Sequence, residues 1–300
     1  MAASKSFGTP HTSILKSKSQ VEVVIRSRPI LPLEIKEKLD SVVDLNEPEG
    51  QVIVALEKTF AFDACFSSDV TQEDIYKNVA AETVQTFAKN LDSNATILAY
   101  GQTGAGKTYT MLGQKIDAGI IQRSLEDIYR ICDPETDSIG IAFYEIHNEK
   151  VFDLLSQSQL KVPLLLREEN GGEFYLPQLK QHWTDSLGEA LDLLNKGLKT
   201  RSIGSTASNE NSSRSHAIFR VTISRTELDE KIEAKLSMVD LAGSESVRKT
   251  NAIGDRLTEA NNINKGLLAL GNCVSDICAN RGHIPFRNST LTKVLRGKNF

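Results

Sequence analysis

The chain has 300 residues, of which 40% are hydrophobic and 25% are charged, and its net charge at pH 7 is −4. This composition is typical of one large folded domain and excludes a disordered chain. No apolar run reaches the roughly 18 residues that a membrane span needs, and the negative charge argues against general nucleic-acid binding. The four cysteines lack metal-ligand spacing, which favours reduced thiols in a cytoplasmic protein.

The chain begins with a Ser- and Lys-rich segment, residues 1–18, that has no apolar signal-peptide core. We interpret it as a flexible arm, followed by a single domain over residues 19–300. In that domain, short apolar runs predict strands at 21–26, 51–55, 95–100, 139–147, 217–225 and 235–240. Longer segments predict helices at 72–91, 107–113, 120–132, 186–198 and 257–279. The alternation predicts a three-layer α/β fold, with a mostly parallel central sheet and helices on both faces.

The turn after the strand at 95–100 has the complete pattern of a phosphate-binding loop, which places the fold in the P-loop NTPase type. Its glycines let successive backbone N–H groups curl around phosphates, and the helix that begins at Lys107 adds the positive end of its dipole. We expect Lys107 to neutralise the β- and γ-phosphates and Thr108 to offer its hydroxyl to Mg²⁺. The predicted nucleotide-binding residues of the loop are Gly101, Gln102, Thr103, Gly104, Ala105, Gly106, Lys107 and Thr108.

A second apolar run, residues 236–239, ends at Asp240. A strand here would deliver the Asp240 carboxylate to the magnesium through a bound water, although a lone aspartate after a strand is more often a turn or helix cap. Three residues later, Gly243 can present its backbone N–H to the γ-phosphate, so that loss of this phosphate would release the loop.

The sequence favours ATP over GTP. A guanine site would need an aspartate two residues after an Asn-Lys pair, and neither Asn195-Lys196 nor Asn264-Lys265 has one.

A polar run over residues 209–216 precedes the strand at 217–225. Its hydroxyl groups and the Arg214 guanidinium suit a mobile loop that touches Mg²⁺ and phosphate. Alone, such a run is usually a solvated turn.

Together these motifs resemble the kinesin motor domain, over about residues 19–296. The phosphate loop, Asn-x-x-Ser-Ser-Arg-Ser-His at 209–216 and Asp-Leu-Ala-Gly-Ser-Glu at 240–245 stand in the family's order and spacing. So do Arg-Ser-Arg-Pro at 26–29, Tyr-Glu-Ile-His-Asn-Glu at 144–149, Ile-Asn-Lys at 263–265 and Leu-Ala-Leu-Gly at 268–271. We call residues 209–216 the first switch loop and residues 240–245 the second switch loop.

The resemblance implies a role for each matching position. Arg26, Arg28 and Pro29 are expected on the adenine side, with Tyr109 stacking on the base from the other side. Ser213 is expected to bind Mg²⁺. Arg214 and Glu245 are expected to form an ion pair that positions water when the switch loops close. An exposed pair of this kind is worth about 0–1 kcal/mol, which suits a contact that must open in each cycle.

The end of the chain is basic, although the whole chain is acidic. Residues 246–300 carry nine Lys and Arg residues against three Asp and Glu residues. A basic face attracts an acidic surface, and in kinesins this region meets the microtubule. The candidate contacts with tubulin are Lys265, Arg287 and Lys293. Without the resemblance, a solvated helix face with uneven charge would explain the pattern equally well.

Two departures from the family qualify the resemblance. Thr290 stands where the family has a lysine, which removes one positive charge and predicts weaker microtubule binding. The family also continues past Phe300 with a central strand, a last helix and a neck, so we expect the domain to be incomplete at this end. The leading hypothesis is a cytoplasmic, microtubule-associated ATPase that uses Mg-ATP for movement, with the spindle as one candidate location. The alternatives are a pseudo-motor that binds without moving and, with less support, a different P-loop ATPase. We expect no direct membrane contact, and oligomers only if a longer chain supplies a coiled coil.

Overall fold

The structure is a computed structural model, and it describes residues 21–55, 57–114, 116–158, 162–169, 172–206, 211–227, 230–245 and 254–296. The predicted arm of residues 1–18 lies outside these ranges. Among the described residues, no helix has both the length and the apolar character needed to cross a bilayer.

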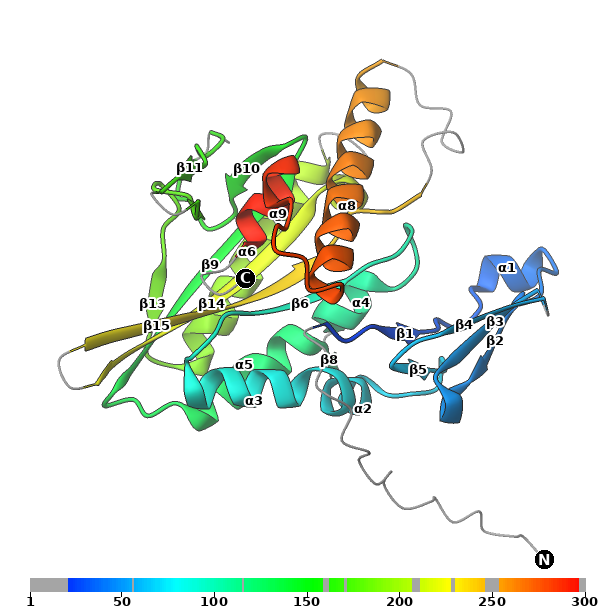
Figure 1. Cartoon of the computed structure of the whole chain (residues 1–300), viewed down its shortest axis with the longest axis horizontal. Helices are drawn as coiled ribbons and strands as arrows, with labels where there is room; N and C mark the ends of the chain where they lie inside the picture. Colours follow the sequence, from blue (N-terminus) through cyan, green and yellow to red (C-terminus); the bar gives the residue numbers. More distant parts are fainter. Residues whose placement is uncertain are drawn as a thin grey trace, which may run out of the picture.

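The described elements follow one another along the chain as in Figure 1. The first half holds β1 (Val24–Arg26), α1 (Pro32–Lys36), β2 (Val43–Asn46), η1 (Glu47–Glu49), β3 (Gln51–Val54), β4 (Lys58–Ala61), β5 (Ala64–Phe66), α2 (Gln72–Ile75), η2 (Tyr76–Ala80), α3 (Ala81–Asn90), β6 (Ala95–Ala99), α4 (Lys107–Leu112), β7 (Gly113–Gln114), β8 (Asp117–Ala118), α5 (Ile120–Ile131) and β9 (Asp137–His147). The second half holds β10 (Lys150–Asp153), β11 (Arg167–Glu168), β12 (Phe174–Tyr175), β13 (His182–Thr184), α6 (Leu187–Thr206), α7 (Asn211–Arg214), β14 (His216–Glu227), β15 (Glu230–Asp240), α8 (Asp255–Cys278), η4 (Phe286–Asn288) and α9 (Thr290–Leu295).

The predicted helices are confirmed, with two differences. The helix predicted over 72–91 consists of α2, the π-helical turn η2 and α3. The helix predicted over 186–198 continues to Thr206 as α6. Both differences bear on the functional site, because α2 and the last turns of α6 each supply a side chain to it.

The main sheet has six strands in the described part of the chain, in the order β10-β9-β14-β15-β6, with β13 also paired to β9. Of these pairs, only β15–β6 is parallel. The prediction of a mostly parallel sheet was therefore wrong, and the sheet is mixed. β10 begins three residues after β9 ends, and β15 begins three residues after β14 ends. Connections this short permit only antiparallel neighbours, because a parallel crossover needs a dozen or more residues.

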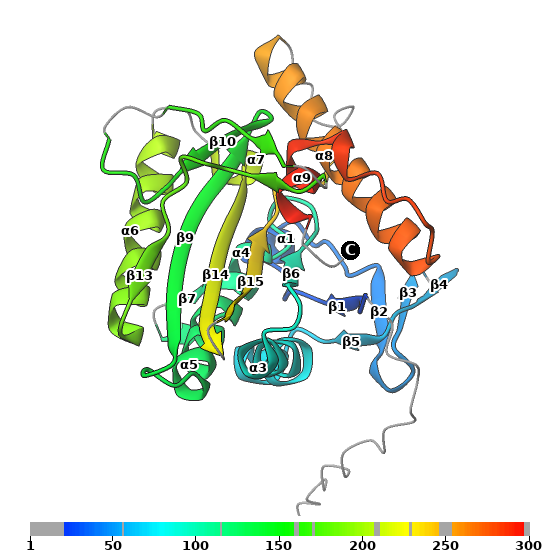
Figure 2. The ribbon, with the colours of Figure 1, turned by 60° about the vertical axis from the view of Figure 1, so that its left-hand side comes forward.

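Helices cover both faces of this sheet, as predicted (Figures 1 and 2). Alternate residues of β9 point to opposite faces, so Ile141 and Phe143 join the core beneath α3, α5 and α6. Ala142 and Tyr144 join the core beneath α8 and α9. The buried residues of α8 include Leu267, Ala269 and Cys273. A smaller three-stranded sheet, β2-β3-β4, lies beside the parallel pair β1–β5 at the right of Figure 1.

The strand register brings three loops to one edge of the main sheet. Asp240 at the end of β15 is level with Ala99 at the end of β6. Asp240 is also paired with Ala217 near the start of β14. The loop after β6, the loop before β14 and the loop after β15 therefore meet, which is the edge where open α/β sheets bind ligands.

Candidate functional site

The loop after β6 forms a concave cradle, as predicted. Gly104 and Gly106 have φ angles of 78° and 95°, which side-chain-bearing residues rarely adopt. The Lys107 ammonium donates to the carbonyl oxygens of Gly101 at 2.8 Å and Gln102 at 2.9 Å. Burial lowers the pKa of Lys107, and the nearby carboxylates Asp240 and Glu245 oppose this shift. A cavity of about 270 Å³ opens here, and its lining residues are Thr103, Gly104, Gly106, Lys107, Thr108, Tyr109, Ser213 and Leu241.

Asp240 lies directly behind Thr108, as the sequence predicts. The Thr108 hydroxyl donates to Asp240 Oδ2 at 2.8 Å, and the Asp240 side chain is almost fully buried. Its other oxygen, Oδ1, is buried and accepts no hydrogen bond from the described residues. A buried carboxylate oxygen needs a donor. A water bound to a magnesium ion would supply one, so the residues fit the expected Mg²⁺.

Arg201, which the sequence analysis missed, completes the Asp240 environment. Its Nη1 donates to Asp240 Oδ2 at 3.0 Å, and its Nη2 donates to the Ser215 carbonyl at 3.1 Å. Both charged side chains are buried, at 7% and 4% exposure. A signal existed in the sequence: Arg201 follows the core residue Leu194 by seven positions, which places an arginine on the buried face of the helix.

The two switch loops touch each other and the cradle through their backbones. The Gly243 N–H, which we expected to face the γ-phosphate, donates to the Ser213 carbonyl at 2.8 Å. The Ser244 N–H donates to the Gly101 carbonyl at 3.1 Å. A Cβ at position 243 would come within 2.4 Å of the Thr103 hydroxyl, so a side chain here would displace the Thr103 and Glu245 side chains.

Arg214 and Glu245 have different partners in this structure from those that the resemblance implies. The Glu245 carboxylate accepts from the Thr103 N–H at 2.9 Å and from the Thr103 hydroxyl at 2.6 Å. Partial burial raises the pKa of Glu245, but these hydrogen bonds outweigh it, and the net pKa is below its usual value. Arg214 Nη1 lies 3.1 Å from Glu259 Oε2 on α8, and His147 Nε2 holds the other Glu259 oxygen at 2.6 Å. An Arg214–Glu245 pair would require both groups to exchange partners.

His216 joins the two switch loops as a neutral side chain. Its Nδ1 accepts the Ala242 N–H at 3.0 Å, which requires an unprotonated nitrogen. Burial, reinforced by the positive charges of Arg201 and Lys107, lowers the pKa of His216 to about 4.

The buried His216 predicts a loss of stability in mild acid. Below pH 6.5 the unfolded chain binds a proton at this residue and the folded chain does not, so stability is complete above pH 6.5 and declines between pH 6.5 and 4. The shift is worth about 3 kcal/mol at most. Urea unfolding of the wild type and of His216→Gln at pH 7.5 and 4.5 measures it: the advantage of the wild type should shrink in acid. An unchanged difference between the two proteins would contradict the assignment.

The predicted adenine-side residues lie beside the cradle. A Cβ at Gly106 would be 3.9 Å from the Arg28 Cβ, and the Arg28 guanidinium binds Glu34 at 2.5 and 2.8 Å. Pro29 is exposed and accepts from Arg28 Nη1 through its carbonyl at 2.9 Å. Arg26 differs from the expectation, because its guanidinium carbon lies 5.2 Å from the centroid of the Tyr109 ring. It therefore supports one face of that ring.

The comparisons with known proteins show the family of this chain. A family model, the kinesin motor domain, matches residues 26–298. This chain belongs to the kinesin motor domain family. It is 36% identical over 291 residues to the human chromosome-associated kinesin KIF4A, covering 92% of this chain and 24% of that protein. It is 37% identical over 302 residues to the rice kinesin-like protein KIN-14R, covering 95% and 30%. A solved structure of a fast kinesin superposes with a TM-score of 0.80 at 34% identity, covering 92% of this chain and 80% of that one. This kinesin domain thus spans about a quarter of the length of the curated relatives it matches.

The three candidate tubulin contacts of this kinesin domain lie on neighbouring elements. Lys265 is exposed on α8, Arg287 is on η4 and Lys293 is on α9, and α8, η4 and α9 contact one another. The turn that carries β11 and β12 also reaches them, because Glu168 pairs with Arg287. The Lys293 ammonium lies 5.7 Å from the Phe174 ring centroid.

Thr290, the departure noted in the sequence, fastens α9 to the residues after β9. Its hydroxyl donates to the Glu149 carbonyl at 3.0 Å, and its N–H donates to the Glu149 carboxylate at 2.9 Å. Of these two contacts, only the hydroxyl bond to the Glu149 carbonyl depends on the threonine side chain, since the other is made by the backbone N–H.

Proposed function

We propose that this chain binds Mg-ATP and hydrolyses it as a microtubule-stimulated, kinesin-type ATPase whose cycle drives movement along microtubules. The observation that carries the proposal is the Thr108–Asp240 hydrogen bond of 2.8 Å. It joins the phosphate cradle to the second switch loop at the place where a P-loop ATPase holds its metal. The cell compartment that fits this function is the microtubule cytoskeleton of the cytoplasm, including the spindle.

Each group of the site has a distinct task in this proposal. The cradle N–H groups and Lys107 bind the β- and γ-phosphates. Thr108 and Ser213 would offer hydroxyls to Mg²⁺, and Asp240 would hold the ion through an intervening water. The ion would neutralise charge that develops on the phosphate oxygens.

The switch loops would change conformation with the presence or loss of the γ-phosphate, and this change would drive movement. Arg214 and Glu245 leave Glu259 and Thr103, pair with each other and orient the attacking water. Arg214 is bonded to Glu259 on α8. The exchange of Glu259 for Glu245 as its partner would therefore release a contact to the helix that carries Lys265.

Adenine would stack on the Tyr109 ring beside Arg28 and Pro29. Tyr109 is 38% exposed and borders the cavity, and the face of its ring opposite Arg26 would receive the base.

ATP turnover measured with and without microtubules tests the proposal directly. Stimulation by microtubules is expected. Binding of microtubules without turnover would favour the pseudo-motor, for which the present pairing of Glu245 with Thr103 is the one favourable observation. A rate of ATP turnover that microtubules do not change would indicate another P-loop ATPase.

Docking to microtubules should be electrostatic, and Glu168 should weaken it. Because Glu168 neutralises Arg287, Glu168→Gln is expected to raise microtubule affinity about two- to threefold at low salt, and added salt should reduce both the affinity and this gain. Co-sedimentation at several salt concentrations measures both effects, with Glu173→Gln, a partly exposed glutamate on the same turn, as the control. An affinity that does not depend on salt would rule out electrostatic docking.

A further inference from the structure

Gln72 is a buried polar side chain that neither the sequence motifs nor the proposed chemistry uses. It is the first residue of α2 and is only 2% exposed. The helix start is fixed by Thr71, whose side chain accepts the Asp74 N–H at 3.1 Å. This cap fixes the backbone position of Gln72, which lies 37 positions before Tyr109 in the sequence.

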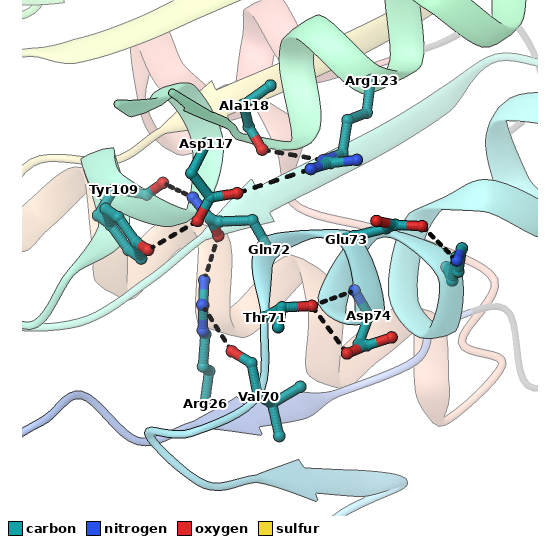
Figure 3. A network of polar contacts seen from close by, with 11 residues as sticks. Arg26, Val70, Thr71, Gln72, Glu73, Asp74, Tyr109, Asp117, Ala118 and Arg123 are labelled. Carbon is teal, nitrogen blue, oxygen red and sulfur yellow. Dashed lines mark hydrogen bonds and ion pairs between the residues drawn. The ribbon is translucent and has the colours of Figure 1, made fainter. Parts of the chain in front are cut away.

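The nitrogen of the Gln72 amide contacts Tyr109 itself, and its oxygen contacts Arg26, which lies against the Tyr109 ring (Figure 3). Its Nε2 donates to the Tyr109 carbonyl at 2.5 Å. Its Oε1 accepts from Arg26 Nη1 at 2.5 Å, and the same Arg26 nitrogen donates to the Thr110 hydroxyl at 3.0 Å. Gln72 therefore sets both the backbone position of Tyr109 and the place of the cation beneath its ring.

The far edge of the ring is fixed as well. The Tyr109 hydroxyl donates to Asp117 Oδ2 at 3.2 Å, and Asp117 lies 3.6 Å from Arg123, which also donates to the Ala118 carbonyl. With the backbone, one face and the hydroxyl all held, the ring keeps one orientation beside the cavity. A fixed ring stacks on a flat ligand without first losing rotational freedom.

We propose that Gln72 is a positioning residue for the nucleobase: it holds the Tyr109 ring, directly and through Arg26, in the orientation on which the base stacks. This inference rests on the proposed function, in which Tyr109 receives adenine. It also gives Arg26 a different role from direct contact with the base, since its guanidinium is engaged beneath the ring.

The proposal predicts a defect that depends on the base. Gln72→Met keeps the length of the side chain and removes both hydrogen bonds. We expect it to weaken Mg-ATP binding about tenfold and to leave binding of Mg-tripolyphosphate unchanged, because the cradle residues 101–108 bind phosphate. Isothermal titration calorimetry of both ligands measures the ratio, with Gln85→Met, a partly buried glutamine bonded to Asp127, as the matched control.

A double-variant cycle tests whether Gln72 acts through the ring. In a Tyr109→Ala background, Gln72→Met should cause no further loss of ATP affinity, because neighbouring residues that act as a unit are not additive. Equal losses in both backgrounds, or equal losses for ATP and tripolyphosphate, would overturn the positioning role while leaving the proposed function intact. If the wild type failed to bind Mg-ATP, both proposals would fall.

Thr110→Val is the second variant should Gln72→Met not fold. It removes the other acceptor of the same Arg26 nitrogen with little change in volume. A smaller loss, confined again to ATP, supports the proposal, and no change in the ratio of ATP to tripolyphosphate affinity refutes it.

Discussion

The Glu245→Ala variant is expected to bind ATP and to hydrolyse it at least about 100-fold more slowly than the wild type. Glu245 is absent from the residues that line the cavity, so its removal should leave ATP affinity nearly unchanged. In our proposal its carboxylate, once paired with Arg214, orients the water that attacks the γ-phosphate. The alanine side chain has no group that can form a hydrogen bond to this water, so the hydrolysis step should slow.

Single-turnover phosphate release and equilibrium ATP binding separate these two effects. Glu233→Ala is the matched control: Glu233 also belongs to an ion pair, with Lys231 and Lys235 on β15, and lies away from the phosphate cradle. Phosphate release at a near-normal rate in Glu245→Ala would refute the assigned role. Loss of ATP binding would indicate instead that the contact between Glu245 and Thr103 shapes the cradle.

The Arg201→Met variant is expected to lower the free energy of unfolding by about 3–5 kcal/mol, because it leaves the buried Asp240 carboxylate without its cation. Arg201 and Asp240 are 7% and 4% exposed, so water cannot replace the lost partner. Methionine fills much of the space that the arginine stem occupies, which limits the loss due to packing. The same change should weaken binding of Mg²⁺ with ATP, since Asp240 would no longer be held beside Thr108.

Urea unfolding measures the stability change. Arg130→Met is the control, because the Arg130–Asp127 pair has an arginine side chain that is 68% exposed and such pairs contribute about 0–1 kcal/mol. Adding Asp240→Asn to Arg201→Met should recover part of the stability by removing the unpaired charge. If the single variant were as stable as the wild type, the buried pair would not be a determinant of the fold.

Much of the fold could be predicted from apolar periodicity, but the direction of the strands could not. The strands containing Phe143, Phe219 and Val239 are present because each has enough apolar side chains to be buried on two faces. The strand containing Ile97 is also present, with its apolar residues half-buried on one face and Leu98 exposed on the other. Their antiparallel pairing depends on the short connections after β9 and β14. The prediction of a mostly parallel sheet used the alternation of strands and helices and did not take the lengths of these connections into account. The small strands β2 and β4 were also missed: β4 is exposed along its length, β2 is exposed over its first two residues, and neither has a long apolar run.

The nucleotide cradle and its acid were predictable because their chemistry is local. Gly104, Gly106, Lys107 and Thr108 must be close in sequence to curve one loop around phosphate, and Asp240 ends an apolar strand. Gln72 lies outside any such motif. Its contact with Tyr109 exists only because α2 and α4 are brought together by the fold.

The sequence by itself determined that this chain has a phosphate-binding loop, two accompanying switch loops and membership of the kinesin family, because these features reside in short, ordered runs of residues. The tertiary structure alone decided which partner each charged side chain takes. Glu245 had Arg214 as its expected partner and binds Thr103, while Arg214 binds Glu259 and Arg201 binds Asp240. Several partners are available to each group along the sequence. The register of β6, β14 and β15 at one sheet edge, together with the packing of α6 and α8 against that edge, sets which of them lie within hydrogen-bonding distance.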